Sequence, residues 1–153
     1  VFRDASFRFD IIGDGAERGN IEGLIKELDL KDKVKLYGEV KRDKAQEILA
    51  ESQCFVMVSS REAFGLVYVE AMAKGCITIG TKGQGIDGVI KHGENGFLCN
   101  SLNVEELTNL IREIINLPNS ELIRISNNAI ETAKNLTDRK VAEHYINSII
   151  NAK

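Results

Sequence analysis

Short apolar runs alternate with helical patterns along the first two thirds of the chain. The runs predict strands over residues 7–12, 34–37, 54–58 and 76–80, with a short fifth strand over 96–99. Between them, apolar residues recur at helical spacing over 21–28, 43–49 and 66–74. Strands separated by helices form parallel βαβ units, and strands that are apolar throughout suit a sheet covered on both faces. The pattern therefore predicts an α/β fold with a doubly wound parallel sheet.

The last third of the chain changes to helical patterns alone. They predict helices over 104–114, 122–133 and 141–150. The first of these begins after Asn103, with Glu106 three positions on, and stops before Pro118, while Thr137 is the expected N-cap of the last. Because no linker or repeat interrupts the pattern, we expect one domain over residues 1–153, a doubly wound sheet with a C-terminal helical tail.

The composition narrows the class of protein. The 153 residues carry 20 Lys and Arg against 23 Asp and Glu, a net charge of −3. A nucleic-acid-binding protein needs clustered positive charge, so this balance argues against one. No apolar run approaches the ~20 residues of a membrane-spanning helix, and no secretory leader is evident. The three cysteines are far apart and odd in number, which predicts buried free thiols and a cytoplasmic protein.

Ligands of open parallel sheets bind beyond the carboxyl ends of the strands, so the loops after the strands are the places to look for a site. Gly13 and Gly15 follow the first strand, but Arg18 stands where a dinucleotide-binding G-x-G-x-x-G motif needs glycine. No P-loop motif occurs. The two glycines fit a tight strand-to-helix turn, contact with a ligand, or both.

The loop after the third strand holds two carboxylates around a helix start. Gly65 falls where the helix should begin, so the backbone N–H groups that follow it can bind an anion such as phosphate. Glu62 precedes this helix, and Glu70 lies inside it among apolar residues, where sugar hydroxyls could supply its hydrogen bonds. The alternative is a surface pair of Glu70 with Lys74 and an ordinary loop carboxylate at Glu62. Spacing alone does not separate these readings.

The run E-A-F-G-L-V-Y-V-E-A-M-A-K-G resembles the E-(x)7-E signature of family-4 retaining glycosyltransferases, which have the GT-B fold. Glu62 and Glu70 take the two acidic positions, with Phe64 and Gly65 between them. Three further blocks, at 11–18, 34–40 and 93–98, resemble family motifs in the same order. The chain departs from the family pattern at Val58, where proline is usual, and at 84–88, where the usual acidic residue is displaced or lost.

The resemblance implies a Rossmann-like half of a GT-B fold that binds the nucleotide-sugar donor. It implies that Glu70 holds the ribose hydroxyls and that Glu62 contacts the donor sugar and is the catalytic candidate. The remaining donor-binding candidates are Phe64, Gly65 and Leu66 at the helix start, Gly13 and Gly15 in the first turn, and Gly38 to Val40 beside the base. No metal and no cofactor are expected. The family's first strand-helix unit and N-terminal acceptor domain would precede Val1.

As a whole, the resemblance implies a retaining transferase that moves a hexose-type sugar to a glycan or lipid-linked acceptor. The motifs resemble a subgroup of bacterial surface polysaccharide synthesis. The expected setting is the cytoplasm, with peripheral association at the inner face of the membrane open to the intact enzyme. The chain alone is expected to be inactive. Two alternatives stay open: a non-catalytic nucleotide-binding or regulatory module on the same scaffold, and a nucleotide-sugar isomerase, whose acid/base residues are not evident.

Overall fold

The computed structural model describes residues 7–137, 139, 140, 142, 146 and 147. The chain divides into two compact units, residues 1–48 and residues 49–153, and each unit has its own parallel sheet. The division falls near the end of a helix, between Ile48 and Leu49. No helix within the described part of the chain is long and apolar enough to cross a membrane.

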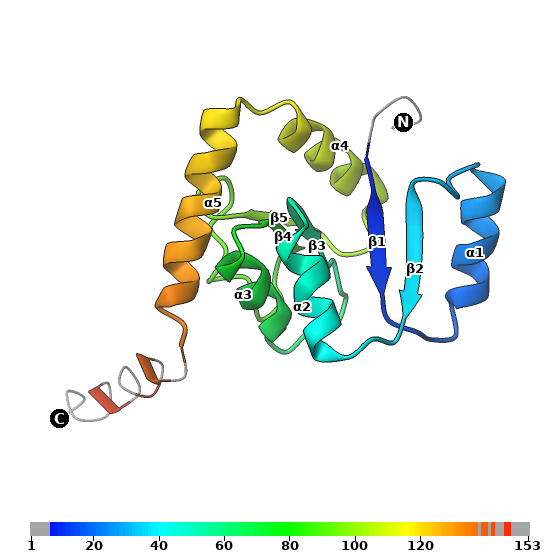
Figure 1. The fold of residues 1–153 in the computed structure, drawn as a ribbon. Helices are drawn as coiled ribbons and strands as arrows, with labels where there is room; N and C mark the ends of the chain where they lie inside the picture. Colours follow the sequence, from blue (N-terminus) through cyan, green and yellow to red (C-terminus); the bar gives the residue numbers. More distant parts are fainter. Residues whose placement is uncertain (1–6, 138, 141, 143–145, 148–153) are drawn as a thin grey trace. The chain divides into compact units, whose positions relative to one another are not determined.

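The first unit is a β-α-β unit followed by most of a further helix (Figure 1). It comprises β1 (Phe9–Ile12), α1 (Arg18–Glu27), β2 (Val34–Gly38) and the larger part of α2 (Arg42–Ala50). The two strands run parallel, with Phe9 opposite Val34, and the register slips between Ile11 and Ile12 so that Ile12 faces Gly38. Because the strands are parallel, their carboxyl ends lie at the same edge of this sheet.

The second unit contains three parallel strands in the order β3-β4-β5 and three helices (Figure 1). Its elements are β3 (Cys54–Val56), α3 (Leu66–Ala73), β4 (Ile77–Thr81), β5 (Phe97–Cys99), α4 (Val104–Ile115) and α5 (Asn119–Lys134). The predicted alternation of parallel strands and helices is thus confirmed, and so is the α/β fold class.

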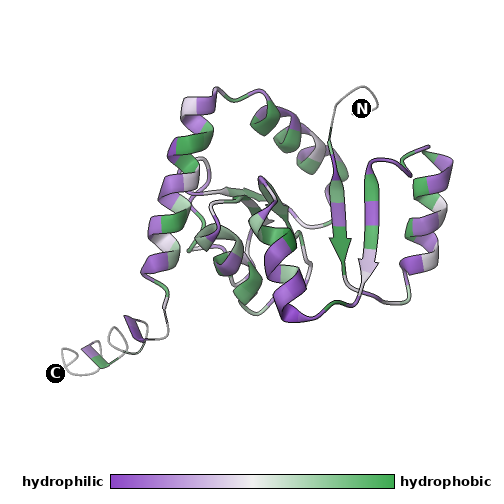
Figure 2. Cartoon of the chain, viewed as in Figure 1, coloured by the Kyte–Doolittle hydropathy of each residue, from purple (hydrophilic) through white to green (hydrophobic). Residues whose placement is uncertain are grey.

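Both faces of the second sheet are covered, as its continuous apolar strands require. All five residues of the central strand β4 are buried. On one face Ile77 and Ile79 join a core cluster with residues of α4, and on the other the backbone of Gly80 lies against Tyr68 of α3. Helix α5 contributes to both clusters. In Figure 2 the strands of this sheet are mainly green, while α4 and α5 mix green and purple positions, the amphipathic pattern of helices that cover a core.

Two helix ends follow signals in the sequence. Asn103 caps α4, since its side-chain oxygen accepts a hydrogen bond from the N–H of Glu106 at 3.0 Å. Gly75 follows the end of α3 with φ 79°, the left-handed conformation that a glycine after a helix favours. The predicted helix over 141–150 lies largely outside the described residues.

The prediction that the cysteines are buried is correct for two of the three. All three thiols are free, and Cys76 and Cys99 are buried. The prediction is wrong for Cys54, which is exposed. Cys54 is the first residue of β3, which is an edge strand of its sheet. The side chain at this position is therefore exposed even though the run that follows it is apolar.

Candidate functional site

The segment between β3 and α3, residues 57–65, is tied to the sheet at its beginning and to the helix at its end. The N–H of Met57 donates to the carbonyl of Ile79 at 3.1 Å and so prolongs the pairing of β3 with β4. The hydroxyl of Tyr68, on α3, donates to the carbonyl of Met57. Tyr68 is fully buried, and its ring meets Phe55 edge to face at 5.6 Å. One tyrosine therefore fixes the helix against the end of the strand.

The Tyr68 hydroxyl remains protonated across the usual pH range. Burial, with a smaller contribution from the negative charge of Glu62, raises the pKa of Tyr68 to about 12. The effect of Glu62 means that its carboxylate lies within electrostatic reach of this hydroxyl. Tyr68 thus acts as a permanent hydrogen-bond donor beneath the candidate site.

The start of α3 offers free backbone donors, as the sequence predicts. Gly65 precedes the helix with φ 72° and ψ 75°, and no side chain caps it. Among the described residues, the N–H groups of Gly65, Leu66 and Val67 have no acceptor. Donors of this kind at a helix N-terminus, with the positive end of the helix dipole, suit a phosphate or another anion.

The two carboxylates lie on either side of this helix start. Glu62 belongs to the segment before α3 and Glu70 to its second turn, and both are half-buried. Phe64 is half-buried as well, while the side chain of Leu66 is 71% exposed, so Leu66 can serve a ligand through its backbone. The second unit thus gathers Glu62, Phe64, Gly65, Leu66 and Glu70 around one helix N-terminus.

The connection that follows β4 supports the Glu62 segment, a feature that the sequence reasoning missed. The side-chain oxygen of Gln84 accepts a hydrogen bond from the N–H of Glu62 at 2.9 Å, and the N–H of Gly85 donates to the carbonyl of Glu62 at 3.3 Å. At the end of β4, the side chain of Thr81 is buried. The only sequence signal here was the altered family motif at 84–88.

A network of charged and polar side chains connects the carboxyl ends of β4 and β5. Glu106 of α4 binds Lys82 at 2.8 Å, and it also accepts hydrogen bonds from the backbone N–H and the side-chain amide of Asn100. These contacts, above all the Lys82 ammonium, lower the pKa of Glu106 from 4.5 to about 2. The network ties the start of α4 to both strand ends.

The loop over residues 92–96 is held by α5. Asn95 is 95% buried, and its amide donates to the carbonyl of Val89 and to the hydroxyl of Thr132, while its oxygen accepts from the N–H of Lys91. Every hydrogen-bonding direction that this side chain commonly uses is thus satisfied inside the protein. The block at 93–98 therefore has a structural role in this chain.

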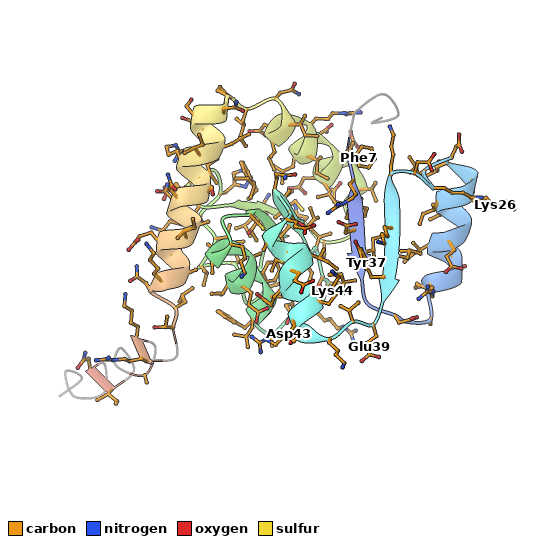
Figure 3. The ribbon with its side chains drawn as sticks, viewed as in Figure 1. Phe7, Lys26, Tyr37, Glu39, Asp43 and Lys44 are labelled. Atoms are coloured by element: carbon orange, nitrogen blue, oxygen red, sulfur yellow. The ribbon has the colours of Figure 1, made fainter. Side chains whose placement is uncertain are left out.

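The site candidates of the first unit lie at the carboxyl ends of β1 and β2. The N–H of Gly13 donates to the carbonyl of Gly38 at 2.8 Å, so the structure brings these two glycines together. Gly15 is exposed and Val40 half-buried, and Glu39 lies next to Val40 on the turn that leads to α2 (Figure 3).

Gly38 has φ 68°, and a Cβ there would lie 3.0 Å from the Arg18 guanidinium. Arg18 binds Asp14 at 2.7 Å, and this hydrogen bond lowers the pKa of Asp14. An ion pair thus stands beside the glycine turn. The sequence analysis did not name Asp14 or Arg18 as site candidates, although the block at 11–18 contains both residues.

No group of three or more His, Cys, Asp or Glu side chains within the described ranges is arranged to hold a metal ion.

Comparison with known proteins identifies the family. The profile of the family "Glycosyl transferases group 1" matches residues 3–135, so the chain belongs to this family. The fold is that of the GT-B glycosyltransferases. The crystal structure of Anabaena Alr3699/HepE in complex with UDP and glucose is similar over 95% of this chain and 41% of that one, with TM-score 0.78 and 26% identity. The C-terminal domain of a group 1 protein (LpcC) from Francisella tularensis matches 77% of this chain and 60% of that one, with TM-score 0.70 and 22% identity.

Two curated relatives show the range of the family. N-acetyl-alpha-D-glucosaminyl L-malate synthase of Bacillus anthracis is 45% identical over 89 residues, 58% of this chain and 23% of that protein. The lipopolysaccharide core biosynthesis glycosyltransferase LpsE of Rhizobium meliloti is 31% identical over 122 residues, 80% of this chain and 35% of that protein. The chain thus spans about a quarter to a third of the length of these relatives.

Proposed function

We propose that the chain is the donor-binding half of a retaining glycosyltransferase that transfers a hexose-type sugar from a nucleotide diphosphate to a glycan or lipid-linked acceptor. In this reaction the bond between the anomeric carbon and the diphosphate oxygen breaks, and the acceptor oxygen bonds to that carbon as its hydroxyl proton is released. The proposed full-length enzyme also contains an N-terminal acceptor domain and a first strand-helix unit. A role in bacterial surface polysaccharide synthesis is part of the proposal.

The observation that carries the proposal is the uncapped start of α3 between Glu62 and Glu70. Three backbone N–H groups without an acceptor among the described residues provide a place for the diphosphate. The two carboxylates provide acceptors for sugar hydroxyls, because a carboxylate can accept from two neighbouring O–H groups at once. The complexes of HepE with UDP and glucose and with UDP-glucose support the same ligand class for this chain.

Within the proposal, each candidate residue has one task. Glu70 holds the ribose hydroxyls, and Glu62 contacts the transferred sugar. The amides of Gly65 and Leu66 bind near the diphosphate, with Phe64 beside them. In the first unit, taken by itself, Gly13, Gly15 and the residues Gly38 to Val40 remain candidates for contact with the donor. The chemistry assigned to these residues requires no metal or cofactor.

The direct test is a binding screen of the full-length enzyme. Calorimetry with a panel of UDP-, GDP-, ADP- and dTDP-sugars should show one nucleotide class bound in preference to the others. Transfer to an acceptor should then follow with the bound donor, and the anomeric configuration of the product, read by NMR, should match that of the donor. Binding of a nucleotide sugar without transfer to any glycan or lipid-linked acceptor would favour the non-catalytic module instead.

A further inference from the structure

Both backbone polar groups of Glu62 are held by two consecutive residues from the connection after β4. The side-chain oxygen of Gln84 takes the Glu62 N–H at 2.9 Å, and the N–H of Gly85 reaches the Glu62 carbonyl at 3.3 Å. Contacts with the sheet and with the helix fix the two ends of the 57–65 segment. These two hydrogen bonds hold the segment in its middle, at Glu62. Gln84 supplies the only side chain in this pair of contacts.

Gly85 brings the two segments into direct backbone contact. A Cβ at Gly85 would lie 1.7 Å from the carbonyl oxygen of Ala63 and 2.7 Å from the Cα of Phe64. Any larger residue would therefore have to push the 62–64 backbone away. The segment rests on the bare backbone of its neighbour, so a small shift of one must move the other.

The supporting residues are themselves firmly placed. The carbonyl of Gln84 accepts from the N–H of Asp87 at 2.8 Å, and the Asp87 carboxylate accepts from the N–H of Gly83 at 2.6 Å. Ile86 is fully buried in the same core cluster as Tyr68. The turn over 83–87 is thus closed on itself and anchored in the core, which makes it a rigid support.

We propose that Gln84 is a positioning residue for Glu62: its side-chain amide sets the backbone at Glu62 and thereby the place where that carboxylate meets the donor sugar. The inference rests on the proposed function of Glu62. Without the Gln84 oxygen, the Glu62 N–H would lose its partner in a half-buried place, and the segment would have to move to reach water. A misplacement of about 1 Å in a reacting constellation can reduce the rate roughly a hundredfold.

The test uses three single variants and one double variant of the full-length enzyme. Gln84→Met keeps the length of the side chain and removes the acceptor oxygen. Gln53→Met is the matched control, because Gln53 is exposed and donates only to the nearby carbonyl of Glu51. Glu62→Gln removes the carboxylate and keeps the backbone N–H. Each variant, and the double variant of positions 62 and 84, is measured for kcat, for affinity to the free nucleotide diphosphate and for hydrogen exchange in residues 59–65.

Gln84→Met should speed hydrogen exchange in residues 59–65 and lower kcat roughly ten- to hundredfold, with nucleotide diphosphate affinity unchanged. In the Glu62→Gln background the same substitution should change kcat by less than about twofold, because its effect passes through Glu62. Gln53→Met should change none of these quantities.

Three results would overturn the inference: unchanged exchange in residues 59–65, equal losses of kcat in both backgrounds, or a matching loss of nucleotide diphosphate affinity. A wild-type enzyme that binds and transfers no sugar contradicts the proposed function and shows this before any variant is compared. Hydrogen exchange still measures the support of the segment in that case.

Discussion

Glu70 combines two properties that rarely occur together, a carboxylate and a half-buried position in a helix whose other side chains are mainly apolar. A carboxylate can accept from two neighbouring O–H groups at once, and the proposal gives Glu70 the two ribose hydroxyls. Substitution of this single residue therefore tests the proposed donor binding directly.

Glu70→Gln should weaken binding of both the nucleotide sugar and the free nucleotide diphosphate by about 1.5–3 kcal/mol, the scale of hydrogen bonds to a charged group. That loss corresponds to roughly ten- to 150-fold in Kd. Calorimetry on the full-length enzyme measures it, with Glu113→Gln, an exposed position on α4, as the control. Unchanged affinity with a small loss of stability would instead assign Glu70 to a surface pair with Lys74.

Glu62→Gln should separate the sugar from the nucleotide. Turnover and nucleotide-sugar affinity should fall, while affinity for the nucleotide diphosphate alone should stay within about twofold, because only the sugar carries hydroxyls within reach of this carboxylate. Steady-state kinetics and calorimetry on one preparation give both numbers. If free-nucleotide binding falls as far as in Glu70→Gln, the two carboxylates act on the same moiety.

Single residues were predictable where their signal is local. The cap at Asn103 was predicted and found, and the left-handed Gly75 likewise depends only on neighbours within a few positions. Gln84 and Tyr68 gain their roles from partners 22 and 11 positions away, at Glu62 and Met57. No spacing rule connects such pairs, so only the folded structure shows them.

At the scale of elements, the start of α3 depends on Gly65, the residue that precedes the helix at the proposed anion-binding N–H groups. Gly65 has φ 72°, and a Cβ there would lie 2.6 Å from the Tyr68 ring. Gly83 has nearly the same φ, 71°, but open space around it. The two positions therefore separate the cost of the backbone conformation from the cost of the contact.

Gly83→Ala should destabilise the protein by about 1–2 kcal/mol, the cost of the left-handed conformation for a residue with a Cβ. Gly65→Ala should cost about 1–3 kcal/mol more, because the new methyl group displaces the buried tyrosine. Urea midpoints of the full-length enzyme compare the two. Equal costs would show that Tyr68 moves aside freely and does not fix the helix start.

The network of Lys82, Asn100 and Glu106 makes the junction of β4, β5 and α4 sensitive to acid. The pKa of Glu106 is about 2 in the folded protein against its ordinary 4.5, so the unfolded chain binds the proton more readily. The stabilisation is present above about pH 4.5 and is lost as the pH falls toward about 2. Urea midpoints between about pH 6 and about pH 3 should therefore fall more steeply in the wild type than in Glu106→Gln. Parallel curves would mean that the network adds no pH-dependent stability.

Element boundaries were less predictable than element types. Helix α5 begins at Asn119, directly after Pro118, whereas the apolar pattern predicts a start near residue 122. The first turn has polar or only partly buried side chains, and hydrophobic periodicity marks only the buried ones. Strand β3 ends at Val56, two residues before its apolar run ends, because the chain turns there to form the Glu62 segment.

At the scale of the whole molecule, strand direction was predictable and strand pairing was not. Apolar runs separated by helices indicate parallel strands, and all the pairs described are parallel. The same pattern does not say which strands are neighbours. The structure pairs β1 with β2 and orders the other three strands β3-β4-β5.

Under the proposed function, the chain of residues 1–153 alone should transfer no sugar, whereas the full-length enzyme should. Transfer requires donor and acceptor in attack geometry, and the proposed acceptor domain is not part of this chain. A sensitive assay of product formation with the preferred donor compares the two proteins at equal concentration. Measurable transfer by the 153-residue chain would show that it contains an acceptor site of its own.

The contacts that support the Glu62 segment are made to its backbone. Gln84 and Gly85 hold the N–H and the carbonyl of Glu62, and the closest approach of Gly85 is to the backbone of Ala63 and Phe64. Side chains at 61 and 63, both exposed, take no part in it. The segment can therefore accept new side chains at these positions and keep its course. Under the proposed function, a scaffold of this kind permits sugar preference to diverge among descendants of one ancestor, or under laboratory evolution, while the backbone at Glu62 stays in place.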